Sequence, residues 1–275
     1  INTDYVTVSE KVGEYAKGDI SEEDLIAIEK VSVVGPGSCG GMYTANTMAS
    51  SIEALGMSLP GSSSQDAVSI DKKQDCQNAG AAIKNLLDHD IKPSDIMTKK
   101  AFENSIAVVI ALGGSTNAVL HLLAMAHSIG VDLDLDDFTR IGKVTPVLAD
   151  IKPFGVHFMS ELNAIGGIAP MMKLMLEKGL LHGDCITVTG KTLEANLQEI
   201  LPYPDDQKII LPLSKPVKNS SHLRVLYGNL APEGAVAKIT GKEGTLFTGN
   251  AKVFNSEEDG MAAILEKKIS EGDVV

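Results

Sequence analysis

Gly35-Pro36-Gly37-Ser38-Cys39-Gly40-Gly41-Met42-Tyr43-Thr44-Ala45-Asn46-Thr47-Met48 is the stretch of this 275-residue chain that decides its fold. A short apolar run at residues 31–34 predicts a strand before it, and a helical pattern follows to about Leu55 and stops at Gly56. A strand, a glycine turn and a helix start together aim backbone N–H groups at a bound anion or cluster. A helix N-terminus also lowers the pKa of a thiol, so Cys39 is a candidate thiolate ligand in an α/β fold.

Four motifs in the same order resemble the dihydroxy-acid/6-phosphogluconate dehydratase family. The first runs from Cys39 to Met48 and continues through residues 53–61, and it is similar to the third cluster-cysteine motif of that family. The others lie at residues 113–122, 184–193 and 226–234. The resemblance therefore extends over nearly the whole chain.

The resemblance implies a hydro-lyase. The Cys-Gly-Gly-Met-Tyr-Thr-Ala-Asn-Thr run that begins at Cys39 is similar to the branched-chain-pathway members, and the sugar-acid members differ just after the cysteine. The implied reaction is dehydration of 2,3-dihydroxy-3-methyl carboxylic acids to 2-oxo acids in valine and isoleucine biosynthesis. A sugar-acid dehydratase of the same family is the nearest alternative, and a non-catalytic anion- or nucleotide-binding module is the alternative from another class. The chain has no Gly-x-Gly-x-x-Gly or Walker pattern to favour that module.

The resemblance also implies the cofactors and the partners. In the family this cysteine is one of three that hold an iron–sulfur cluster, [2Fe–2S] or [4Fe–4S], so Cys39 is the expected cofactor-binding and metal-ligating residue. The other cluster cysteines, the Mg²⁺ ligands and the serine base belong to family motifs before Ile1 and after Val275. We therefore expect no catalytic residue within this chain, an inactive isolated fragment, a small-molecule dihydroxy-acid substrate and a full-length homodimer.

The composition restricts the partners and the compartment. The formal net charge is −12 and the pI about 4.9, which disfavours nucleic acid and anionic membranes as partners. No run approaches the ~18 apolar residues of a membrane helix, and no secretory signal opens the chain. The three cysteines are widely spaced, which fits a reducing compartment. We expect a cytoplasmic bacterial protein, or an organellar one if the source is eukaryotic.

The expected architecture is a layered α/β/α domain whose N-terminal part is missing, followed by the start of a truncated β-barrel-like domain. The chain opens on Ile1 and ends on an apolar run that reads as the start of a strand, so we expect a piece of a longer protein. Residues 1–204 are assigned to the cluster-binding domain and residues 205–275 to a proline-rich linker and the first strands of the β-rich domain.

Two further segments are candidates for substrate binding. The loop at residues 61–64 contains Ser62 and Ser63, and it is either a simple turn or a hydroxyl-rich rim of the site. The glycine pair at residues 113–114 separates two apolar helices, so a helix N-terminus lies inside the protein and its N–H groups need partners. Ser115 or Thr116 caps that helix, or the N–H groups face the carboxylate of the substrate.

Several other residues are interpreted as structural. Cys76 lies among polar residues on a predicted helix and is interpreted as structural or surface-exposed, and Cys185 lies in a predicted strand. His121 and His127 lie on an apolar helix and are expected to be core residues rather than ligands. The acidic run at residues 134–138 lacks the glycine and the glutamate of a calcium loop, so it predicts a helix N-cap.

Overall fold

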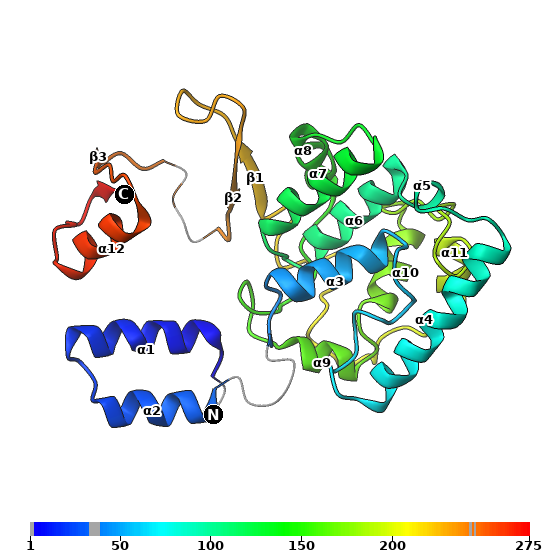
Figure 1. Cartoon of the computed structure of the whole chain (residues 1–275), viewed down its shortest axis with the longest axis horizontal. Coiled ribbons are helices and arrows are strands. Elements are labelled where there is room, and N and C mark those ends of the chain that lie inside the picture. Colours follow the sequence, from blue (N-terminus) through cyan, green and yellow to red (C-terminus); the bar gives the residue numbers. More distant parts are fainter. Residues whose placement is uncertain (1–2, 33–38, 242–243, 245) are drawn as a thin grey trace. The chain divides into compact units, whose positions relative to one another are not determined.

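The structure is a computed structural model that describes residues 3–32, 39–241, 244 and 246–275 (Figure 1). Its contacts divide the chain into two compact units, Ile1–Ser32 with Thr240–Val275, and Val33–Ile239. Among the described residues, no helix combines the length and the apolar character needed to cross a membrane.

The unit Val33–Ile239 is mostly helical. Its helices are α3 (Thr44–Ala54), α4 (Ile70–Asp88), α5 (Pro93–Ile96), α6 (Lys99–Ala111), α7 (Asn117–Ile129), α8 (Leu135–Val144), α9 (Met159–Ala164), α10 (Ala169–Glu177) and α11 (Leu193–Leu197). The strands β1 (Leu223–Leu226) and β2 (Ala235–Lys238) pair antiparallel, with Leu223 opposite Lys238.

Helix α6 is the centre of the core of this unit. Every residue from Asn104 to Ala111 is buried, and α3, α7 and α8 pack around the helix (Figure 1). From Ile106 to Ala111 this helix is apolar on all sides, and such a segment is stable only when it is covered on all sides, so the second half of α6 requires this central position. Helix α3 directly follows Cys39, and its packing on α6 fixes the cysteine segment to the core.

Local capping chemistry explains where the helices begin. Asp134 accepts a hydrogen bond from the backbone N–H of Asp137 at 3.0 Å, which forms a capping box and confirms the predicted N-cap. Ser21 makes the same motif at the start of α2 (Glu22–Val31). The methionines of α10, Met171, Met172 and Met175, are buried in the core as the sequence predicts.

The other unit consists of short elements. Helices α1 (Tyr5–Lys17) and α2 (Glu22–Val31) pack on each other, and the turn between them uses a left-handed Gly18 at φ +82°. Strands β3 (Asn250–Ala251) and β4 (Asp273–Val274) pair parallel, and α12 (Glu257–Leu265) lies between them in sequence.

The structure confirms the mixed α/β class and corrects parts of the prediction. Within the described ranges the named strands form only two two-stranded sheets and no closed barrel. The strand predicted at residues 31–34 is wrong at its start, because Val31 ends α2 and Ser32 is the C-cap of that helix, whereas residues 33–38 lie outside the described residues. The strand predicted around Cys185 is also wrong, since only an isolated bridge joins Ile186 to Thr192 in a turn-rich segment. The domain boundary at residues 204/205 stays a prediction.

Candidate functional site

The backbone of the Cys39 turn is fixed by one side-chain amide. Asn46 lies in the first turn of α3, and its Nδ2 donates to the carbonyl oxygens of Cys39 and Gly41, both at 2.7 Å. The thiol of Cys39 is half-buried, and its Sγ lies 3.7 Å from the carbonyl oxygen of Gly41. The sequence therefore presents an accessible thiol on a rigid turn at a helix N-terminus.

The segment that leads into α9 is hydrogen-bonded to the same turn. The N–H of Met42 donates to the carbonyl oxygen of Lys152 at 2.6 Å, and the N–H of Met159 donates to the carbonyl oxygen of Gly40, also at 2.6 Å. A Cβ on Gly41 would lie 2.7 Å from that Lys152 oxygen and 2.6 Å from the Tyr43 ring, so no larger residue fits. The glycine is needed because two backbone segments approach closely here.

The N-termini of α3 and α7 meet beside this turn. The Nδ2 of Asn117 donates to the Oγ1 of Thr44 at 2.7 Å, and the N–H of Ser115 donates to the Oγ1 of Thr47 at 3.0 Å. Thr116 occupies the N-cap position of α7 but makes no side-chain cap, and Ser115 instead accepts a hydrogen bond from the N–H of Asn117 at 3.2 Å. Two partly positive helix ends therefore lie close together, and one of them belongs to the helix that follows the Cys39 turn.

The carbonyl groups of the turn before α7 are held by two basic side chains from the C-terminal part of the same unit. The Nζ of Lys238 donates to the oxygens of Gly113 at 2.9 Å and Gly114 at 3.2 Å. The Nε2 of His222 lies 2.7 Å from the oxygen of Gly114. Burial lowers the pKa of Lys238 to about 8 and that of His222 to about 3. The sequence prediction missed both residues, and its only available signal was a lysine at the end of an apolar strand.

The serine loop lies at the other end of α3. The N–H groups of Gly61 and Ser63 donate to the Oε1 and Oε2 of Glu53 at 2.8 and 2.9 Å, and the Oγ of Ser62 donates to Asp75 at 2.6 Å. Glu53 is 4% exposed, and burial raises its pKa. Helix α3 has 11 residues and is therefore about 16 Å long. The structure thus brings Ser115 and Thr116 to the Cys39 end and leaves Ser62 and Ser63 at the opposite end.

The other candidate ligands lie elsewhere. Cys76 is exposed on α4, and Cys185 is buried, which raises its pKa. His121 and His127 are exposed, so their predicted core position is wrong; α7 buries Ala118, Val119, Leu122 and Ala126 instead. Within the part of the chain that the structure describes, no three His, Cys, Asp or Glu residues form a group that could hold a metal ion.

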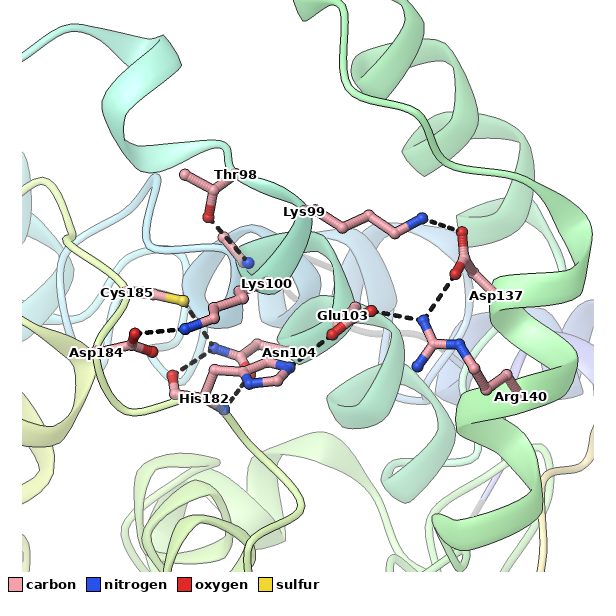
Figure 2. A network of polar contacts seen from close by, with 11 residues as sticks. Thr98, Lys99, Lys100, Glu103, Asn104, Asp137, Arg140, His182, Asp184 and Cys185 are labelled. Carbon is pink, nitrogen blue, oxygen red and sulfur yellow. Dashed lines mark hydrogen bonds and ion pairs between the residues drawn. The ribbon is translucent and has the colours of Figure 1, made fainter.

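A second polar network lies on the outer side of α6 (Figure 2). Glu103 accepts hydrogen bonds from Arg140 at 2.5 Å and from the Nε2 of His182 at 2.6 Å. Arg140 also donates to Asp137 at 2.7 Å. Burial would raise the pKa of Glu103, but the hydrogen bonds from Arg140 and His182 lower it below its usual value. The network joins α6 to α8 and to the segment before Cys185. Because its members bond to one another across these elements, we interpret the network as structural.

Known proteins match this chain along its whole length. The family model described as dihydroxy-acid/6-phosphogluconate dehydratase N-terminal matches residues 1–196, and the corresponding C-terminal model matches residues 208–275. The dihydroxy-acid dehydratase of Chromohalobacter salexigens is 67% identical over 274 residues, which is 100% of this chain and 48% of the relative.

Two further relatives give the same result. Proteins named dihydroxy-acid dehydratase 2 from Pseudoalteromonas translucida and Acinetobacter baylyi are 64% and 65% identical over 274 residues, again 100% of this chain and 49% of each relative. The chain thus spans about half the length of the curated relatives it matches. Both family models and these identities show that the chain belongs to the dihydroxy-acid/6-phosphogluconate dehydratase family.

Proposed function

We propose that the full-length protein carrying these residues dehydrates 2,3-dihydroxy-3-methyl carboxylic acids to 2-oxo acids in valine and isoleucine biosynthesis. The observation that carries this proposal is the accessible thiol of Cys39 on a rigid turn where two helix N-termini meet. The names of relatives that are more than 60% identical support the dihydroxy-acid substrate class. A sugar-acid substrate is the second candidate within the family, and no contact among the described residues favours it.

Cys39 is the residue that would hold an iron–sulfur cluster. A half-buried thiol at a helix N-terminus is the right donor chemistry for cluster iron. The fit is partial, because a cluster needs several thiolates and Cys76 and Cys185 are placed on other elements. The remaining ligands, and those of Mg²⁺, would come from parts of the full-length protein outside this chain. When bound, cluster iron supplies a Lewis acid for the hydroxyl that leaves carbon 3.

The N-terminus of α7 is the place where this chain would bind the carboxylate of the substrate. Ser115 and Thr116 lie there beside α3, and the dipole of a helix favours a carboxylate at its N-terminus. The sequence leaves the loop with Ser62 and Ser63 as either a turn or a rim of the site, and the contacts of these serines with Glu53 and Asp75 favour the turn.

The architecture and assembly of the whole protein follow the same proposal. We infer that a full-length protein completes the layered α/β/α domain and the β-barrel, forms a homodimer and works in the cytoplasm of a bacterium. The matches to both family models across residues 1–196 and 208–275 support the two-domain organisation. The 275-residue chain alone should be inactive, because Cys39 supplies one thiolate and a cluster needs several.

The test is a turnover assay on the full-length protein, purified without oxygen. It should convert 2,3-dihydroxy-3-methylbutanoate to the 2-oxo acid and should act poorly on a sugar acid such as gluconate. Turnover by the isolated 275-residue chain would contradict the assignment of the missing ligands, and a preference for gluconate would favour the sugar-acid alternative.

A further inference from the structure

One short loop packs against two glycine turns, the turn before α3 and the turn before α7. The loop comprises residues 150–158 and carries two phenylalanines. A Cβ on Gly40 would lie 3.0 Å from the Cδ1 of Phe158. A Cβ on Gly113 would lie 3.3 Å from the Cβ of Phe154. One segment therefore contacts two turns that are far apart in the sequence.

The loop closes on itself through its own backbone. The N–H of Lys152 donates to the carbonyl oxygen of His157 at 2.8 Å, and the N–H of His157 donates to that of Asp150 at 3.0 Å. The N–H of Gly155 donates to the carbonyl oxygen of Ile151 at 2.7 Å. A Cβ on Gly155 would lie 2.1 Å from the Oδ1 of Asp150, so only glycine fits there. These contacts fix the path of the loop.

Neighbouring side chains fix the orientation of Phe158. Its N–H donates to the Oε2 of Glu161 at 2.7 Å. The Oε1 of the same carboxylate accepts a hydrogen bond from the Nδ1 of His157 at 2.9 Å. The Nζ of Lys152 lies over the ring, 4.7 Å from its centroid, and a cation in this position is attracted to the face of the ring. Both the backbone and the ring of Phe158 are therefore held in place beside Gly40.

Phe154 anchors the loop at the turn before α7. Its ring meets the ring of His222 edge to face, with the centroids 5.8 Å apart and the planes at 69°, which is a favourable aromatic geometry. The Nε2 of His222 in turn lies 2.7 Å from the carbonyl oxygen of Gly114. The loop is thus tied to this turn through Phe154, and Phe158 reaches from the same loop to the cysteine turn.

We propose that Phe158 is a positioning residue for Cys39, which packs on Gly40 and keeps the cysteine turn in one orientation. The ring acts with the two backbone hydrogen bonds at 2.6 Å that join the turn to Lys152 and Met159. This rests on the proposed function, because the orientation of the thiol matters for the reaction only if Cys39 ligates a cluster. Residues that orient a metal ligand without touching the metal change metal affinity by about 10–100-fold.

The first measurement is the rate at which the full-length protein, purified without oxygen, loses iron to a chelator. Phe158→Ala removes the ring from Gly40 and should release iron on the order of tenfold faster than wild type. Phe254→Ala is the matched control, because Phe254 is also half-buried and also faces a glycine, with its Cδ2 3.8 Å from the place of a Cβ on Gly260. Phe254→Ala should release iron at the rate of wild type.

The second measurement needs neither turnover nor bound iron. The amide of Met42 is protected by its hydrogen bond to Lys152, so its hydrogen exchange reports how tightly the loop holds the turn. In the iron-free full-length protein, this exchange should be at least about tenfold faster in Phe158→Ala than in Phe254→Ala. Exchange along α6 should be equal in the two variants, because a general loss of stability would accelerate exchange there as well.

Each outcome decides the proposal. Equal iron release from Phe158→Ala and Phe254→Ala overturns it, and so does an exchange rate that rises as much along α6 as at Met42. If Phe158→Ala does not fold, Phe158→Leu and Phe254→Leu take the place of the alanine pair, and equal iron release from these two overturns the proposal. A wild-type protein that holds no iron contradicts the proposed function instead, and the exchange at Met42 then decides the positioning role.

Discussion

Asn46 and Cys39 are coupled through the backbone: the Nδ2 of Asn46 lies 2.7 Å from the carbonyl oxygen of Cys39 and 2.7 Å from that of Gly41. One amide group therefore neutralises two carbonyl dipoles that would otherwise repel a thiolate on the same turn. Residues that orient a metal ligand in this way affect metal affinity without touching the metal.

Replacing Asn46 with alanine should weaken retention of the proposed cluster in the full-length protein. We expect iron to be lost to a chelator about 10–100 times faster than from wild type. The measurement is the decay of visible absorbance in the presence of a chelator. Asn104→Ala is the matched control, because Asn104 also bonds the backbone twice, at His182; equal decay in the two variants would contradict the orienting role.

A side chain at Gly41 should destabilise the unit that contains the site. The added Cβ of Gly41→Ala would meet the Lys152 oxygen at 2.7 Å, and overpacking of this kind costs about 1–3 kcal/mol of unfolding free energy. Urea denaturation measures the change. Gly80→Ala on α4 has open space and should instead stabilise by about 0.5–1 kcal/mol, as expected for a glycine within a helix; similar shifts for both variants would argue against the close approach.

His222 should make stability depend on pH on the acidic side. Its pKa is about 3 when folded and 6.5 in the unfolded chain, so the unfolded state binds more protons between these values. The stabilising effect is complete above pH 6.5 and is lost as the pH falls towards 3, at up to about 1.4 kcal/mol per pH unit. His222→Gln keeps a donor for Gly114 and should flatten the curve of unfolding free energy against pH. His127→Gln, at an exposed position, should not change it.

Glu103 should contribute to stability through its two partners (Figure 2). Glu103→Ala leaves Arg140 and His182 without that acceptor, and hydrogen bonds to charged groups are worth about 1.5–3 kcal/mol. A double-mutant cycle with His182→Ala measures the coupling in unfolding free energy. The exposed pair of Lys84 and Asp88 is the comparison and should give about 0.5 kcal/mol or less; a coupling no larger than this at Glu103 would show that the network is only a surface feature.

Local chemistry made much of the helical framework predictable from sequence. The cap at Asp134 and the buried methionines of α10 depend on neighbours within one or two turns, so their patterns are readable directly. The apolar pattern of α7 does not show which side of the helix is buried. The helix has more apolar residues than it buries, so Leu120 is 63% exposed, and His121 and His127 are exposed as well.

The parts of the site that sequence could not supply come from distant segments. The contact of Lys238 with Gly114 spans 124 residues, and the contact of Met42 with Lys152 depends on how a separate loop packs. Neither has a local pattern. The position of Ser62 and Ser63 likewise follows from the length of α3. The Cys39 turn and the serine loop are close in sequence, but they lie at opposite ends of this helix.

The most direct test of the account is the visible spectrum and iron content of the full-length protein, purified without oxygen, for wild type, Cys39→Ser and the control Cys76→Ser. The account predicts that wild type and Cys76→Ser are brown and contain iron, and that Cys39→Ser loses both colour and iron. A Cys39→Ser protein that keeps the colour and iron of wild type would contradict the assignment of Cys39 as a cluster ligand.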